Sequence, residues 1–589
     1  MKRRHFLLWS AVVGLGGCAV WDLHGPGANK PDEAQKSDSP PKLVGDLATP
    51  FGLFPVKVEA VSLVMGLNGT GSDPEPSPQR AMLIEEMKRR NVKNPNQLLA
   101  SRNAALVLVR AILRPGIQKG DRFDVEVRIP GRSETMSLRG GCLLETRLND
   151  TALVENRLFN GKVRGLAQGP VLVDPSATDK SAVALLCRGR VLGGGVALEP
   201  RSLGLLLKSG DETEMTPQQL RDAAMTSSRV ANAINRQFHT FKDGIKVGVA
   251  TAKTGRYVDL AVHPRYKDNI ERYMQVLRAV GLEDSIAETS RRIISLEAEL
   301  LDPSTAARAA LQLEALGKSG VPPLLKGIQS ANAEVRFVSA EALAYLDRPE
   351  AAEPLAEAAR QEPAFRAMAL TALAAMDEFT ASDQLRQLLG VPSAETRYGA
   401  FRALWRVNPN EPLVKGEQLG GQFSYHVLDT AGPSLVHVAR SQRAEVVLFG
   451  RDQRLLTPLA INAGPHIMIN SGGGEAVSVS KFTSNQPDQR RAVSPRLDEV
   501  IRAIVDLGGT YPDVVQALQE AKASGALESR FEVEAVPATG RLYDSTAQGE
   551  PKAEAEKPPS TTSKGNDAPK GLDKDGWKTA DLRVDAVEK

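Results

Sequence analysis

Cys18 is the first residue in the chain whose position indicates chemistry. It ends the stretch Leu15–Cys18 (LGGC), which follows a basic start at residues 2–4 and an apolar segment at residues 6–14. This order is typical of a lipoprotein signal peptide, in which small residues let a signal peptidase reach the backbone and the cysteine thiol takes a diacylglycerol. A short signal peptide with an unrelated cysteine is the alternative. The pattern predicts a signal peptide over residues 1–17 and lipidation of Cys18.

The same segment indicates the route of export and the membrane. Arg3 and Arg4 fit a twin-arginine export signal, but many signals for the general secretory route also carry two arginines, so both routes stay open. The apolar segment is too short to span a bilayer. Ala19 stands after the cysteine, where an aspartate commonly retains lipoproteins at the inner membrane. We therefore expect an outer-membrane lipid anchor that faces the periplasm.

Two further cysteines, Cys142 and Cys187, lie in apolar, strand-like segments. A pair of cysteines in an oxidising compartment can form one disulfide. Two separately buried thiols that act as small apolar side chains are the alternative. The distance between the two Cα atoms decides between them, and it cannot be read from the sequence.

Other residue types that commonly do chemistry do not form a known site pattern. The phrase Gly66–Gly71 (GLNGTG) lacks both the Lys-Ser/Thr of a P-loop and the spacing of a dinucleotide site, which favours a structural turn. No H-x-x-x-H or H-E-x-x-H pattern or cysteine knuckle is present, and there is no G-x-S-x-G elbow. His426 and His437 flank a predicted hairpin and could meet across it. A pair of histidines that are hydrogen-bonded or exposed is favoured over a zinc site. The sequence predicts no catalytic residue, no metal site and no cofactor, and hence no enzyme.

Length and composition set broader limits. A chain of 589 residues is expected to hold about three or four domains. Its 25% charged and 42% hydrophobic residues are ordinary for globular protein. A net charge of +3 and an aromatic content of 5% argue against a nucleic-acid partner.

Residues 43–282 combine strand-like and helical segments between glycine and proline punctuation. The pattern is that of an α+β domain. Strands are predicted at residues 61–65, 104–113, 123–129, 182–187, 245–249 and 258–262, and helices at 79–90, 216–236 and 267–280.

Several phrases of this segment, in this order, resemble the flagellar basal-body P-ring protein family. VSLVMGLNGTG at residues 61–71 is followed by a Pro-Gly turn at 115–116, by SLRGGCLL at 137–144 and by a helix at 226–238. The resemblance implies a structural, ring-forming domain over residues 43–285. P-ring proteins are exported but not lipidated, so Cys18 is a departure from the family. The residues that carry the ring motif are Gly66, Asn68, Gly69, Gly71, Pro115, Gly116, Arg139, Gly140 and Gly141.

A repeat rich in Ala, Leu and Glu follows from about residue 300. Similar phrases recur at residues 306–316, 334–346, 364–376 and 395–407, and their arginines are Arg308, Arg336, Arg366 and Arg397. These units resemble HEAT repeats, which implies an α-solenoid over residues 299–412 in which helical pairs stack into one core. An irregular helical bundle is the alternative. We expect the arginines to link adjacent units through a carboxylate or a helix terminus, and the array to serve as a protein-docking arm.

The remaining segments complete a multidomain chain. Strand and helix patterns at residues 415–545 predict a small α+β domain without a recognised family. Residues 18–42 and 546–589 are polar and rich in Pro, Lys, Asp and Ser, which predicts a disordered tether and a disordered tail.

The leading hypothesis is a P-ring-like structural subunit of the bacterial flagellar basal body, lipid-anchored in the periplasm around the rod. Its expected partners are copies of itself in a ring and rod or other envelope proteins. Peptidoglycan is a further candidate, which the basic run Lys88–Lys93 could contact. A solvated helix end is the alternative for that run. The runner-up function is a non-flagellar envelope lipoprotein scaffold that reuses the ring domain. A hydrolase in residues 415–543 is a third, less favoured hypothesis.

Overall fold

The computed structural model describes residues 42–154, 157–174, 183–208, 215–282, 285–483, 486–541 and 543. All but the last belong to one compact unit, residues 1–541. Cys18, the signal peptide, all but the last residue of the predicted tether, and the predicted tail lie outside the described residues. Among the described helices, none has the length and apolar character needed to cross a membrane.

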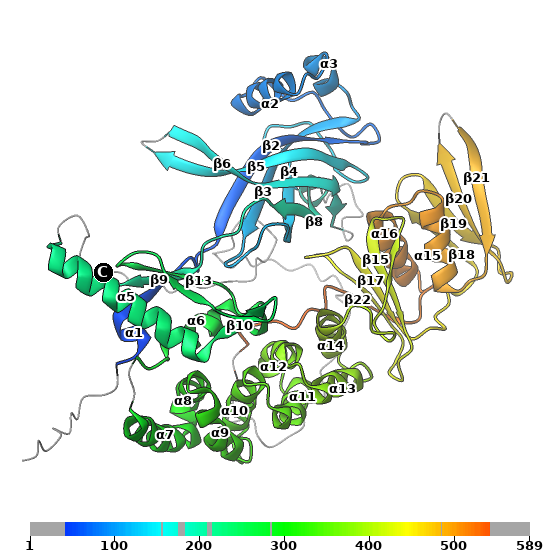
Figure 1. Cartoon of the computed structure of the whole chain (residues 1–589). Coiled ribbons are helices and arrows are strands. Elements are labelled where there is room, and N and C mark those ends of the chain that lie inside the picture. Colours follow the sequence, from blue (N-terminus) through cyan, green and yellow to red (C-terminus); the bar gives the residue numbers. More distant parts are fainter. Residues whose placement is uncertain are drawn as a thin grey trace, which may run out of the picture. The chain divides into compact units, whose positions relative to one another are not determined.

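A closed β-barrel forms the first part of the described chain (Figure 1). The strand order is β4-β3-β2-β5-β6-β8, and β4 also pairs with β8, which closes the sheet on itself. Closure removes sheet edges that would otherwise pair with other chains. The buried side chains of alternating strand positions, such as Val107, Val125 and Val191, fill the interior. The strands are β2 (Val56–Met65), β3 (Ala104–Leu113), β4 (Arg122–Arg128), β5 (Cys142–Val154), β6 (Arg157–Pro170) and β8 (Arg188–Ala197), with a short β7 (Leu172–Val173) beside β8.

A smaller α/β part follows the barrel. Its sheet has the order β1-β9-β13-β12, and α5 packs on β12 and β13. The side-chain amide of Asn235 in α5 makes two 2.8 Å hydrogen bonds with the backbone of Ala250, which fixes the helix on the sheet. The elements are α1 (Val44–Leu47), β1 (Ala48–Phe51), β9 (Gly204–Leu207), α5 (Pro217–Gln237), the hairpin β10 (His239–Lys242) and β11 (Ile245–Gly248), β12 (Ala250–Ala252), β13 (Tyr257–Leu260), η3 (Pro264–Tyr266) and α6 (Ile270–Arg278). Outside this part, α2 (Pro78–Arg89) and α3 (Pro95–Leu99) pack on β2 and β3 of the barrel, and α4 (Val183–Leu186) contacts β8.

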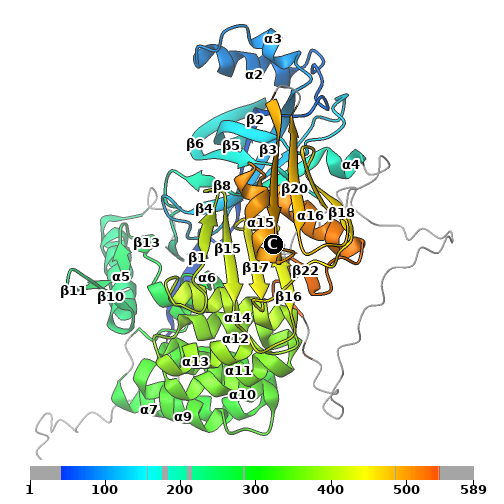
Figure 2. The ribbon, with the colours of Figure 1, turned by 90° about the vertical axis from the view of Figure 1, so that its right-hand side faces the viewer.

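Eight helices then stack in two layers (Figure 2). In one layer α8, α10, α12 and α14 lie side by side, and α7, α9, α11 and α13 form the other layer. Alanines at the contacts, for example Ala310, Ala340 and Ala369, are fully buried and allow close approach. The helices are α7 (Ile286–Leu301), α8 (Pro303–Ala315), α9 (Val321–Gly327), α10 (Ala333–Tyr345), α11 (Ala352–Gln361), α12 (Pro363–Ala375), α13 (Phe379–Leu388) and α14 (Ala394–Val407).

The last folded part contains two sheets and two helices around one core. A mixed sheet of order β14-β15-β17-β16-β22 is followed by an antiparallel meander, β18-β19-β20-β21. The elements are β14 (Glu417–Leu419), β15 (Phe423–Leu428), β16 (Leu435–Val438), β17 (Glu445–Phe449), β18 (Leu459–Ala463), β19 (Ile467–Ser471), β20 (Val477–Thr483), β21 (Gln486–Val493), α15 (Leu497–Asp506), α16 (Tyr511–Ala523) and β22 (Arg530–Val533).

The fold differs from the sequence-based expectations at three places. Residues 183–186 form a helix where a strand was predicted, and β8 begins only at Arg188. The long pair β5 and β6 was not predicted, because its strands carry many polar residues and lack a continuous apolar alternation. His426 and His437 do not meet across a hairpin, since β17 lies between their strands and its Val447 pairs with both.

The α/β part is held to the helix array by a buried ionic cluster. Arg272 of α6 lies 2.6 Å from Glu314 of α8 and 2.5 Å from Glu341 of α10, and its side chain is 10% exposed. Burial alone would lower the pKa of Arg272, but the charges of Glu314 and Glu341 outweigh it and raise that pKa, so the guanidinium stays charged. Tyr266 donates a 2.6 Å hydrogen bond to the second oxygen of Glu314. Each buried charge therefore has a partner.

Replacing Arg272 by Ala should lower the free energy of unfolding by about 3–5 kcal/mol, because it leaves two buried carboxylates without their cation. Guanidinium-induced unfolding of the purified chain measures the change. Arg308→Ala is the matched control, since its ion pair with Glu299 is largely exposed and should be worth less than about 1 kcal/mol. An equal effect of the two substitutions would contradict the role assigned to Arg272.

Candidate functional site

The two glycine phrases of the predicted ring motif meet in the structure. Met65 at the end of β2 pairs with Cys142 at the start of β5. Beyond this pair, the Met136 N–H donates to the Thr70 carbonyl at 2.9 Å, and the Thr70 hydroxyl donates to the Ser137 carbonyl at 2.8 Å. We call this contact between residues 66–71 and 136–141 the glycine junction.

Close packing and backbone conformation explain the glycines. A Cβ added at Gly71 would lie 2.1 Å from the Ala104 carbonyl oxygen, and one at Gly141 would lie 2.4 Å from Val64 Cγ1. The remaining motif glycines have positive φ, a conformation that side chains disfavour; they are Gly66, Gly69, Gly116 and Gly140. The N–H groups of Gly69 and Gly71 donate to carbonyl oxygens of the chain itself, and Asn68 is exposed beside them.

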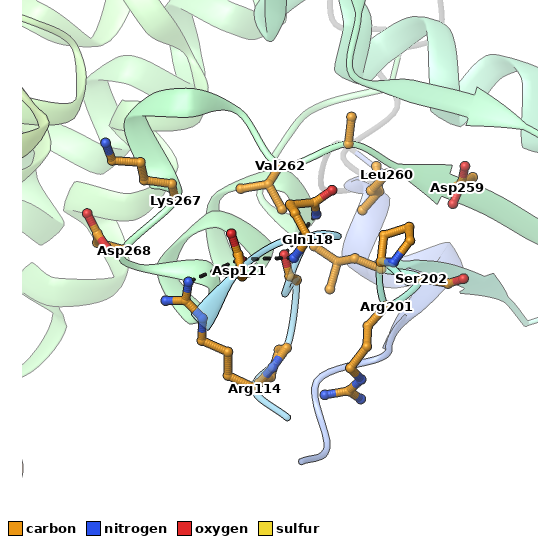
Figure 3. A pocket seen from close by; sticks show the side chains of 15 residues that line it. Arg114, Gln118, Asp121, Arg201, Ser202, Asp259, Leu260, Val262, Lys267 and Asp268 are labelled. Carbon is orange, nitrogen blue, oxygen red and sulfur yellow. Dashed lines mark hydrogen bonds and ion pairs between the residues drawn. The ribbon is translucent and has the colours of Figure 1, made fainter. Parts of the chain in front are cut away.

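Pro115 and Gly116 line a different feature, a cavity of about 630 Å³ between the β3–β4 turn and the α/β part (Figure 3). Charges of both signs line it. Arg114 pairs with Asp121 at 3.3 Å, while Lys267 and Asp268 lie across the cavity. No group of three or more His, Cys, Asp or Glu side chains that could hold a metal ion occurs in the described part of the chain.

The other motif residues and the cysteines lie apart from this cavity. Arg139 is half-buried at the glycine junction, where burial lowers its pKa and the charges of Glu520, Asp174 and Asp513 act in the opposite direction. Cys142 is exposed and Cys187 is buried, and both are free thiols. The candidate disulfide is absent: Cys142 is exposed at the start of β5, while the buried Cys187 thiol lies 3.3 Å from the Thr135 carbonyl.

Three of the four repeat arginines share one role. Each lies four residues after the N-cap of its helix and donates to carbonyl oxygens at or just beyond the end of the preceding helix, where the helix dipole favours a cation. The acceptors are Ser330 and Ala331 for Arg336, Ala359 for Arg366 and Leu389 for Arg397, at 2.7–3.0 Å. A link to a carboxylate of the adjacent unit is also present at Arg366, which pairs with Glu395 at 3.0 Å.

Arg308 does not share this position. The N-cap of α8 is Asp302, so Ala306 occupies the matching place and Arg308 lies half a turn further on, where it pairs with Glu299 of α7. The capping residues, which are Asp302, Asn332, Glu362 and Ser393, mark the repeat more regularly than the arginines do. Three of these four residues are of types that favour the N-cap, so that part of the signal was available in the sequence.

Exposed apolar side chains gather at two places in the α/β part that the sequence analysis did not single out. In the hairpin β10–β11, Phe241 is 69% and Ile245 68% exposed; beyond β1, Phe54 is 59% exposed. The Asp-Gly turn at residues 243–244 is a hairpin signal that could have identified the first. Large apolar side chains exposed in this way are typical of protein–protein contacts.

Two arginines of the basic run at the end of α2 pair with carboxylates of α2 itself and of β5. Arg89 pairs with Glu85, and Arg90 lies 2.9 Å from Glu86 and 3.5 Å from Glu145. These exposed ion pairs reduce the positive charge available to an acidic polymer.

The comparisons with known proteins agree on the first part of the chain. Residues 44–297 match the family described as flagellar P-ring protein. The flagellar P-ring protein of Nitrosospira multiformis is 30% identical over 227 residues, which cover 38% of this chain and 55% of that protein. That of Thermotoga maritima is 28% identical over 245 residues, which cover 41% of this chain and 67% of that protein. That of Nitrosomonas europaea is 29% identical over 259 residues, covering 43% of this chain and 60% of that protein. The chain thus spans between 55% and 67% of the length of these curated relatives.

Among solved structures, a chain of the complex of CpcE and CpcF of phycocyanin lyase from Nostoc sp. PCC7120 is 28% identical. It covers 21% of this chain and 84% of that chain, with a TM-score of 0.18. A score this low supports no argument about the fold.

Gly71→Ala should destabilise the barrel by about 1–3 kcal/mol, because the added Cβ meets backbone atoms that cannot move aside. Thermal unfolding followed by circular dichroism measures the loss. Gly131→Ala is the matched control, since a Cβ there would meet no atom within 4 Å. Equal unfolding temperatures for the two variants would show that the glycine junction tolerates side chains.

Acidification should destabilise the last folded part through its two buried histidines. Burial lowers the pKa of His426 to about 4 and that of His437 to about 3, and the charges of Arg443 and Arg402 add to these effects. Because the unfolded chain takes up these protons near pH 6.5, the stability contribution is complete above that pH and is lost as the pH falls. At pH 5 the loss is about 2 kcal/mol for each histidine.

Urea unfolding at pH 7.5 and pH 5 measures this pH dependence. His437→Gln keeps an acceptor for the Ala535 N–H, which His437 Nε2 accepts at 3.0 Å, and should remove about half of the dependence. His466→Gln is the control, because His466 is exposed and its replacement should leave the dependence intact. An unchanged pH dependence in His437→Gln would contradict the assignment.

Proposed function

We propose that this chain is a structural, non-enzymatic component of the bacterial flagellar basal body: a P-ring-like periplasmic subunit that surrounds the rod. The observation that carries the proposal is the match of residues 44–297 to the flagellar P-ring family, together with a barrel whose glycine phrases lie at one junction. Lipidation at Cys18 would anchor the subunit to the outer membrane.

Self-assembly into a closed ring requires two different, complementary surfaces on each subunit. The hairpin β10–β11 and the region around Phe54 are two separate exposed apolar places on the α/β part. We propose that the hairpin of one copy contributes to the contact with the next copy. The helix array, as HEAT-like repeats, would bind further basal-body proteins through its α7, α9, α11 and α13 layer, since α14 is covered by the chain's own last part.

A non-flagellar envelope lipoprotein scaffold is the second candidate function. Two observations favour it. The lipobox-like LGGC precedes a segment that matches a family whose members are not lipidated, and folded residues 298–541 extend beyond that match. Deleting the gene separates the candidates, because loss of motility with basal bodies that lack a ring supports the flagellar function. Normal flagella in the deletion strain would rule it out.

Phe241→Asp combined with Ile245→Asp should weaken self-association at least about tenfold, because each aspartate would be buried in an apolar contact. Sedimentation velocity and electron microscopy of the lipid-free protein, with and without rod or wall material, measure assembly. Met225→Asp on α5, which is 64% exposed, is the matched control and should assemble normally. Normal assembly of the double variant would remove the hairpin from the interface.

A further inference from the structure

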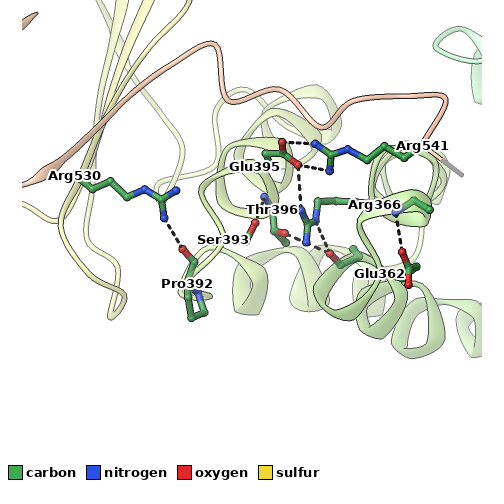
Figure 4. Close-up of polar contacts among 10 residues, drawn as sticks. Glu362, Arg366, Pro392, Ser393, Glu395, Thr396, Arg530 and Arg541 are labelled. Carbon is green, nitrogen blue, oxygen red and sulfur yellow. Dashed lines mark hydrogen bonds and ion pairs between the residues drawn. The ribbon is translucent and has the colours of Figure 1, made fainter. Parts of the chain in front are cut away.

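The residues that follow β22 lie on the helix array. We call residues 534–541 the strap. The Ala535 N–H donates to His437 Nε2 at 3.0 Å, and Glu534 accepts from the Arg440 N–H and the Ser441 hydroxyl. Beyond this anchor, the strap reaches α14, where Arg541 binds both carboxylate oxygens of Glu395 at 2.6 and 2.8 Å (Figure 4).

The surface of α14 is shaped for the strap at two neighbouring positions. Glu395 and Gly399 lie one turn apart on the same helix face. A Cβ at Gly399 would lie 2.5 Å from Leu370 Cδ1 of α12 and 2.8 Å from Pro537 Cγ, so the absence of a side chain makes room both for the neighbouring helix and for the proline. Glu395 also pairs with Arg366 of α12 at 3.0 Å, which holds its carboxylate in place for Arg541 (Figure 4).

The backbone pairing of the strap ends at Glu534, whose N–H donates to the Val438 carbonyl at 2.9 Å. Within the described residues, the N–H groups of Ala538, Thr539 and Gly540 donate no hydrogen bond to another backbone group, and all three residues are exposed. The bidentate Arg541–Glu395 pair holds the far end of the strap and is partly exposed to solvent. A solvent-screened pair of this kind is weak enough for a competing segment to displace.

We propose that the face of α12 and α14 around Glu395 and Gly399 is a peptide-binding surface, and that the strap is its internal ligand. The ligand that fits in its place is an extended segment of another protein that carries a proline and, near it, an arginine. The proline occupies the space at Gly399, and the guanidinium binds the Glu395 carboxylate that Arg366 orients.

A fluorescent peptide with the sequence of residues 533–543 tests this proposal on the full-length chain. Arg541→Glu weakens the strap and should raise the affinity for the peptide at least about tenfold over the wild-type chain, because the internal competitor is lost. The double variant Arg541→Glu/Glu395→Gln should lose that gain. A peptide in which the residue corresponding to Arg541 is Glu should not bind.

Arg530→Glu is the matched control. Arg530 lies on β22 beside Pro392 (Figure 4) and pairs with Glu532 instead of Glu395, so its variant should bind the peptide as weakly as the wild type. Thermal unfolding confirms that each variant is folded, and Arg541→Ala provides a milder release of the strap. Equal peptide affinity of the wild type and both Arg541 variants, or binding that persists without Glu395, would overturn the proposal. Neither result depends on ring assembly.

Discussion

Arg272 lies enclosed between two carboxylates from two different helices, and this one buried charge constrains how the first half of the chain meets the second. Glu314 and Glu341 belong to α8 and α10, so the guanidinium can be satisfied only when both helices stand at their observed spacing. Tyr345 adds to the enclosure, since the Arg272 guanidinium lies 4.8 Å from its ring centre. Buried charges tolerate few alternative arrangements. The ionic cluster therefore fixes the position of the α/β part relative to the helix array.

The opposite end of the array is held by a second buried polar contact. Tyr398 of α14 donates a 2.8 Å hydrogen bond to Glu445 of β17 and stacks on His437 of β16 at 3.5 Å. Arg397 reaches Thr430 from the same helix. The array is thus packed against its own chain at α8 and α10 and again at α14, which limits the surface it can offer to other proteins.

Closure of the barrel decides which strand edges stay free in the first part of the chain. Because β4 pairs with β8, the strands of the barrel satisfy one another. Free strand edges remain in the α/β part, at β1 and at the hairpin β10–β11, and the exposed Phe54, Phe241 and Ile245 lie at these places. The glycine junction has a structural task, since its glycines are required by close backbone contacts and by positive φ.

Local patterns in the sequence determined a large share of this fold. The strand at 104–113 has the predicted bounds, because periodicity and punctuation act within a few residues. The glycine phrases and the repeat were likewise visible as local signals. Only the tertiary structure decided the rest: the pairing of β4 with β8, the placement of β17 between His426 and His437, and the enclosure of Arg272. Each of these joins residues far apart in the chain, and their energy depends on burial and on partners that no local pattern specifies.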